Sequence, residues 1–145
     1  AGRQMKDPTL DLQKLLFTTL SHDLAWDVYD RVPDDAVMPY ITLDGITGSE
    51  NGTKDCFEVE LIATLSVHDG FTGDAGGKSN VLDIGEQIIG VLRGRPPIFQ
   101  FVSDFKIIWI VLDFAETVEQ ELNTIYLYQR VLRFRCLVEE LPTSP

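Results

Sequence analysis

A stretch of alternating side chains at residues 55–69 constrains the fold more than any other part of the chain. Successive side chains of a β-strand point to opposite faces of a sheet, so a period of two in hydrophobicity predicts a strand. One parity is apolar and the other is mostly polar, with Ile62 as the exception, which predicts one long strand with a dry face and a wetter face. The apolar positions are Phe57, Val59, Leu61, Ala63, Leu65 and Val67, and the polar ones are Cys56, Glu58, Glu60, Thr64, Ser66 and His68.

A helix is predicted before this strand, opening at Asp7 and Pro8 and ending at residues 21–23. An Asp side chain caps helices well, and Pro is tolerated at the first helical position because the N–H that it lacks would have no partner there. Leucines recur at helical spacing and predict the buried stripe of this helix. They are Leu12, Leu15, Leu16, Leu20 and Leu24.

A second helix is predicted after the long strand and a Gly-rich loop at residues 70–78, with Ser79 as a candidate N-cap and Gly94 as the stop. Gly85 lies on its apolar stripe, where the missing side chain favours a close approach of the helix to the sheet. The stripe consists of Val81, Ile84, Ile88 and Leu92.

Two short strands are predicted between the first helix and the long strand, at residues 28–32 and 38–43. Pro39 has no N–H to donate to a ladder, so the second of these strands begins there or lies at an edge of the sheet. Residues 45–55 are rich in Gly, Ser, Asn and Asp, and we expect them to join this strand to the long strand as an extended hairpin.

Two long strands are predicted to close the chain, at residues 105–112 and 125–138. The first is apolar on both parities, which is typical of a central strand covered on both faces. Residues 113–123 carry three glutamates and few apolar side chains, and we interpret them as a solvated hairpin tip that extends beyond the sheet. In the last strand Leu132, Phe134, Cys136 and Val138 are expected to point inward and Arg133 and Arg135 outward.

These elements predict an α+β fold, with a mainly antiparallel sheet of about five strands, two helices packed on one face, and the order α-β-β-β-α-β-β. A chain of 145 residues fits a single domain. Flexible ends are expected at residues 1–7 and 140–145. Two helices cover only one face of such a sheet, so the other face is left to loops or to another subunit.

The formal net charge of −11 excludes nucleic-acid binding through a basic patch, because an acidic surface repels phosphate. No run of about 18 apolar residues is present, so no membrane-spanning helix is expected. The two cysteines, Cys56 and Cys136, are too few for a disulfide scaffold. Both lie in strand patterns, and we interpret them as small buried hydrophobic residues.

One motif points to a different chemistry. The segment GGKS at residues 76–79 resembles the end of a phosphate-binding loop, in which backbone N–H groups and a Lys hold phosphates. Residues 107–113 mimic the apolar strand ending in Asp that helps to hold the metal in such proteins. The spacing fails, because the first Gly of the motif would fall on Thr72. A small nucleotide- or metal-binding domain or enzyme that uses residues 70–79 remains the alternative function.

Catalytic and metal-ligating patterns are otherwise weak. His22 and His68 are isolated, and His68 with Asp69 and Asp74 lacks a recurring ligand spacing. No Gly-x-Ser-x-Gly segment is present. We therefore expect neither enzymatic activity nor a cofactor. The aromatic side chains are interpreted as core or interface anchors, with Phe99 and Phe101 as the interface candidates.

The order of the predicted elements resembles that of the tail-completion, or tail-terminator, proteins of long-tailed bacteriophages and gene transfer agents. The segments VYDRVP at residues 28–33 and MPYITL at residues 38–43 resemble the opening strands of that family. The segment FEVEL at residues 57–61 is similar to its long third strand. Residues 79–92 are similar to its second helix and residues 126–134 to its closing strand, so the resemblance covers residues 8–138.

The resemblance implies a structural virion protein rather than an enzyme. Such proteins form a ring, usually a hexamer, on the head-proximal end of the tail tube, where the ring stops tube growth and joins the tail to the head connector. The implied partners are further copies of the chain, the major tail tube protein and a head–tail connector or stopper protein. DNA passes through the ring without specific binding, and no membrane is involved. The implied location is the virion tail, after synthesis in the host cytoplasm.

Three loops without a place in the predicted core are the expected interface parts, at residues 45–55, 70–78 and 113–123. Together with the two candidate phenylalanines they supply the interface residues Glu50, Asn51, Phe71, Asp74, Lys78, Phe99, Phe101, Glu116, Glu119 and Glu121.

Overall fold

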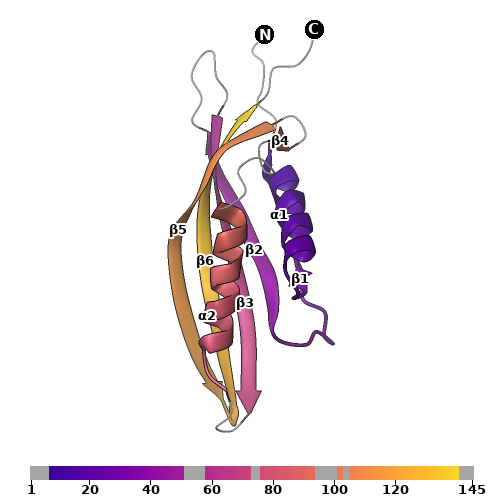
Figure 1. Ribbon diagram of the computed structural model, residues 1–145, viewed down its shortest axis with the longest axis vertical. Coiled ribbons are helices and arrows are strands. Elements are labelled where there is room, and N and C mark those ends of the chain that lie inside the picture. The colour runs from indigo at the N-terminus through magenta and orange to yellow at the C-terminus, as the bar shows by residue number, and fades with distance from the viewer. Residues whose placement is uncertain (1–6, 51–57, 73–75, 94–100, 103–104, 141–145) are drawn as a thin grey trace.

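Six strands form one sheet, and both helices lie on the same face of it (Figure 1). The computed structural model describes residues 7–50, 58–72, 76–93, 101–102 and 105–140. The spatial order of the strands is β1-β2-β3-β6-β5-β4, with β1 parallel to β2 and every other pair antiparallel. The elements are α1 (Thr9–Asp23), β1 (Val28–Tyr29), β2 (Tyr40–Glu50), β3 (Glu58–Thr72), α2 (Ser79–Arg93), β4 (Phe101–Val102), β5 (Phe105–Leu122) and β6 (Ile125–Glu140).

This architecture confirms the predicted α+β fold class with two helices on one face. The short strand β4 is an addition that the sequence pattern does not predict. Of the expected flexible ends, residues 1–6 and 141–145 lie outside the described residues. Asp7 belongs to the start of α1, and Glu140 is the last residue of β6.

The alternating stretch forms β3, at the centre of the sheet between β2 and β6. Its predicted dry face is confirmed, since Leu61, Leu65 and Val67 are fully buried beneath the helices. Residues 55–57 lie outside the described residues, so the strand is seen from Glu58 onward. Each large apolar side chain buried in this way contributes about 1.5–3 kcal/mol to folding.

Helix α1 ends at Asp23, within the predicted range, but it begins one residue later than predicted, with Pro8 as the N-cap and Thr9 as the first helical residue. The Asp7 carboxylate accepts hydrogen bonds from the backbone N–H and the hydroxyl of Thr9, at 3.0 and 2.6 Å. The bond from the Thr9 hydroxyl is the main reason why the pKa of Asp7 is lowered from its ordinary value. Leu12 and Leu16 are buried on the predicted stripe, and the helix packs on β1 and β2.

Helix α2 crosses the middle of the sheet and packs on β3, β5 and β6. Its predicted stripe is buried, and Gly85 is buried with it. A Cβ atom at Gly85 would lie 3.1 Å from Cγ of Arg130, so the predicted close approach at this glycine is confirmed. The Lys78 carbonyl accepts the bond from the N–H of Leu82, so Lys78 holds the capping position and Ser79 is the first helical residue.

The two strands before β3 differ in length from the prediction. Strand β1 spans only two residues, which pair with Ile41 and Thr42 of β2, and the pairing of β2 with β3 shifts register just beyond them, at Asp44. Strand β2 continues through residues 45–50, which we expected to be part of an extended hairpin. Gly48 is well suited to this position, because a Cβ atom there would lie 2.8 Å from Cδ2 of Leu61. Residues 51–57 lie outside the described residues.

The prediction of a doubly covered central strand at residues 105–112 is wrong. Strand β5 lies next to the end of the sheet, and only Phe105 and Lys106 pair with the short β4. Two register shifts explain the apolar residues on both parities: the pairing slips between Ile107 and Trp109, and again between Leu112 and Phe114. Each β-bulge exchanges the parity that faces the helices, so both parities contribute to the core in turn.

The acidic segment at residues 113–123 is not a tip that extends beyond the sheet, which corrects a second prediction. Its residues up to Leu122 belong to β5 and pair with β6. The connection is the short turn at Asn123 and Thr124, where Asn123 has a φ of 57°. Because Thr72 of β3 also pairs with Ile125, three strands reach the same end of the sheet. The glutamates are solvated because β5 is nearly an edge strand.

Candidate functional site

The loop before α2, one of the expected interface parts, is tied to the sheet by an ion pair. Lys78 Nζ lies 2.9 Å from Glu119 Oε1, and both side chains are about half exposed. The hydrogen bond to Glu119 is the main cause that raises the pKa of Lys78. The structure therefore brings together two of the predicted interface residues that are 41 positions apart in the sequence.

A second contact holds the same loop. Gly76 has a φ of +82°, and a Cβ atom there would lie 2.3 Å from the ring of Phe71. That ring also packs against Tyr128, with 6.2 Å between the ring centroids. Gly76 is thus required by its backbone conformation and by the neighbouring ring of Phe71. Lys78, the cation of the same segment, already has Glu119 as its partner. These contacts account for the GGKS segment in structural terms.

The other predicted interface residues fall into two groups. Glu116, Glu119 and Glu121 are exposed on β5. The backbones of Glu50 and Phe101 belong to β2 and β4, but their side chains lie outside the described part of the structure, as do Asn51, Asp74 and Phe99 altogether.

The face of the sheet opposite the helices, here called the open face, places aromatic and apolar side chains of β5 beside arginines of β6. Arg133 lies over the ring of Phe114 at 5.0 Å and donates to Asp113 at 3.0 Å. Arg135 lies 5.7 Å from the ring centroid of Trp109. The outward orientation predicted for both arginines is confirmed, and their partners are aromatic and acidic side chains of the same chain.

The open face is polar along β2 and β3. The bulged residue Asp44 accepts hydrogen bonds from the hydroxyls of Thr42 and Ser66, the first at 2.6 Å. Gln129 donates to Ser66 at 3.0 Å, and His68 Nε2 lies 3.0 Å from the Thr42 hydroxyl. Since Thr42 gives its proton to Asp44, the imidazole is the donor in that last contact. Sequence reasoning missed this network, because the bulge that turns Asp44 into it has no local signal.

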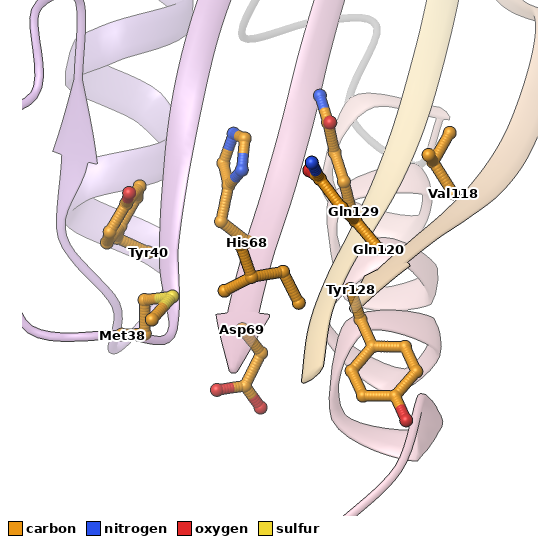
Figure 2. Close-up of a pocket in the computed structure, with 9 residues that line it drawn as sticks. Met38, Tyr40, His68, Asp69, Val118, Gln120, Tyr128 and Gln129 are labelled. Carbon is orange, nitrogen blue, oxygen red and sulfur yellow. The ribbon is translucent and has the colours of Figure 1, made fainter. Parts of the chain in front are cut away.

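A shallow hollow of about 230 Å³ lies at one end of the open face. Figure 2 shows Tyr40, His68, Gln129 and Val118 along it, from four neighbouring strands. Ligand pockets usually enclose about 300–1,000 Å³, so this hollow is small for one. Among the described residues, no group of three or more His, Cys, Asp or Glu side chains is placed to hold a metal ion.

Within the described part of the chain, both sides of the sheet have a stretch of strand backbone that pairs with no further strand. On the outer side of β5, described residues after Lys106 pair with no other strand. On the outer side of β2, β1 pairs only with Ile41 and Thr42. Unpaired N–H and C=O groups along a strand are a template for pairing with another chain. The geometry therefore favours a surface for assembly.

Neither described helix combines the length and the apolar character that crossing a bilayer requires. Cys136 is buried, and its burial raises the pKa of the thiol to about 12, which agrees with its interpretation as a small core residue. Cys56 lies outside the described residues.

Comparisons with known proteins give the chain a family. No curated protein sequence matches it. Its fold matches a chain of a solved structure described as the virion of a native gene transfer agent particle, with a TM-score of 0.73, 20% sequence identity, and coverage of 88% of this chain and 94% of that one. The model of the family "Tail completion protein gp17" matches residues 16–139. The chain therefore belongs to the tail completion protein gp17 family and is a structural protein of the virion tail.

Proposed function

We propose that the chain forms a closed ring of identical copies, a hexamer, at the head-proximal end of the tail tube. The ring stops growth of the tube and joins the tail to the head connector. Membership of the tail completion family over residues 16–139 is the observation that carries this proposal. The fold shared with a chain of a gene transfer agent virion supports it.

The physical properties of the chain fit this role. A ring requires surfaces that neighbouring copies cover, and the bare edges of the sheet offer them. The net charge of −11 fits a passage for DNA, because like charges prevent the nucleic acid from adhering to the wall. The partners in this proposal are the major tail tube protein on one side of the ring and a connector or stopper protein on the other.

Electron microscopy of the purified chain tests the proposal. Negative-stain images are recorded of the chain alone, of tail tubes alone, and of the two together. We expect rings at high protein concentration, or tubes that carry a cap at one end after mixing. A chain that stays monomeric and leaves tube ends unchanged at every concentration would contradict the proposed function.

Tube length provides a second measurement. Tube protein that polymerises without the chain should give a broad distribution of lengths, and addition of the chain during polymerisation should shorten the tubes. Heat-unfolded chain is the control. Equal length distributions with native and with unfolded chain would speak against a role in termination.

A further inference from the structure

We infer that neighbouring copies join by extending the sheet, with the outer edge of β5 in one copy paired to the outer edge of β2 in the next. This inference rests on the proposed ring and names the surfaces that build it. The occupant of each bare edge is therefore a second copy of this chain.

The β5 edge has the properties of a docking strand. Only its first two residues pair with β4, so a long stretch of described backbone faces outward without a partner. Three apolar side chains, Val111, Phe114 and Val118, are exposed by 41–43% on the open face of this strand. Long edge strands with exposed apolar side chains are rare in monomers, because they recruit other strands.

The β2 edge is similarly bare and has an apolar surface beside it. Beyond Thr42, its described residues have β3 on one side and no strand on the other. Leu10 and Phe17 of α1 are exposed and, with Leu43 of β2, line a groove of about 160 Å³. An incoming strand at this edge would meet apolar side chains as well as backbone hydrogen-bonding groups.

Strand direction makes the two edges compatible in a ring. Three antiparallel steps lead from β2 through β3 and β6 to β5, so β2 and β5 run in opposite directions. Copies related by rotation about one axis keep their orientation relative to that axis. When the strands run roughly along the axis, β5 of one copy therefore meets β2 of the next in an antiparallel arrangement.

Charge argues against the alternative in which two β5 edges pair about a two-fold axis. Glu116 lies on the open face of β5, whereas Glu119 and Glu121 lie on the opposite face, where Lys78 pairs with Glu119. Two β5 strands paired with each other would therefore bring carboxylates of both copies together on both faces of the contact. Like charges on neighbouring strands destabilise a sheet. The segment of β2 from Gly45 to Ser49 carries no charged residue, so it accepts the acidic strand without this repulsion.

Two single variants and a matched control test the inference. V118K places a charge on the β5 edge, and T47K places one on the β2 edge, both at exposed positions of the open face. L82K is the control, because Leu82 is exposed by 41%, the same fraction as Val118, and belongs to helix α2 rather than to either edge strand. Thermal unfolding of each variant, followed by circular dichroism, checks that the fold is retained.

Assembly is measured by sedimentation velocity over a concentration series and by negative-stain images with tail tubes. We expect wild-type and L82K chains to form rings, whereas V118K and T47K each need a concentration at least about tenfold higher or form none. A mixture of V118K and T47K should give a two-copy species, because the intact β2 edge of one pairs with the intact β5 edge of the other. This species cannot grow into a ring.

The outcomes separate this inference from the proposed function. Rings formed by either edge variant at wild-type concentrations, or a mixture that stays monomeric, would overturn the edge-to-edge contact while leaving the ring itself intact. Dimers formed by the wild-type chain and by T47K, but not by V118K, would indicate pairing of two β5 edges about a two-fold axis, because that contact closes after two copies. A wild-type chain that forms no ring under any condition contradicts the proposed function.

Discussion

The two faces of strand β6 are made of the same backbone and have different surroundings. On the covered face, Phe134 is 0% exposed and belongs to the hydrophobic core. On the open face, its neighbour Arg133 stacks over Phe114, which is 42% exposed although it is equally large and apolar. The comparison teaches that the covered face serves stability and that the open face keeps apolar surface available.

The largest expected effect tests this difference directly. Phe134→Ala should lower the free energy of unfolding by about 3–5 kcal/mol, because it removes a buried ring and leaves a cavity. Phe114→Ala on the open face should cost about 1 kcal/mol or less, the contribution of an exposed cation–π contact. Urea unfolding of the free chain measures both values. Equal losses for the two phenylalanines would mean that the open face also belongs to the core.

The next largest effect concerns the polar half of the open face. Asp44→Ala should cost about 1–3 kcal/mol, because the buried hydroxyls of Thr42 and Ser66 lose their acceptor. Asp113→Ala removes a carboxylate from the more exposed ion pair with Arg133 and should cost less than about 1 kcal/mol. Urea unfolding measures both losses of stability. Repeating it at moderate salt separates them, because salt screens the exposed ion pair of Asp113 more than the partly buried hydrogen bonds of Asp44. A larger loss for Asp113→Ala would reverse the interpretation of this face.

A smaller effect, of opposite sign, comes from the two sides of α2. Gly90 is exposed and a Cβ atom there would meet no atom within 4 Å, so Gly90→Ala should stabilise the fold by about 0.5–1 kcal/mol. Gly85→Ala gains the same helix propensity but places its Cβ atom 3.1 Å from Arg130. We expect its net effect to be zero or destabilising in thermal unfolding. Equal stabilisation by both changes would show that the helix does not approach the sheet closely.

The smallest expected effect is a pH dependence of the free energy of unfolding, which arises from His68 on the open face. Burial lowers the pKa of His68 from its ordinary 6.5, and the negative charge of Asp44 partly opposes this shift. The folded chain therefore binds this proton less readily than the unfolded chain does. The stability that His68 contributes is complete above about pH 6.5 and falls as the pH drops below that value.

His68→Gln tests this pH dependence and keeps an N–H donor within reach of Thr42. The melting temperature of the wild-type chain should fall more steeply between pH 7.5 and 5.5 than that of the variant. His22, which is exposed and paired with Asp23, is present in both proteins and serves as an internal control. Parallel curves for the two proteins would exclude His68 as the titrating group.

The exposure of some expected interface residues could be predicted from the sequence, whereas their contacts depend on residues far apart in the chain. The exposed glutamates of β5 were identified correctly as surface residues because their charge leaves few other places for them. The pairing of Lys78 with Glu119 and the packing of Phe71 under Gly76 depend on which strands become neighbours. No local pattern contains that information, because the partners are far apart in the chain.

The sequence by itself determined the elements whose signal is local: the period of two in β3 and β6, the leucine stripe of α1, and the stripe of α2 with Gly85. Only the tertiary structure decided the bulges at Asp44 and in β5, the place of β5 beside the edge, and the polar network around Ser66. The physical reason is that side-chain periodicity follows from the geometry of one segment, whereas register and strand order follow from pairing energies between segments that meet only in the folded chain.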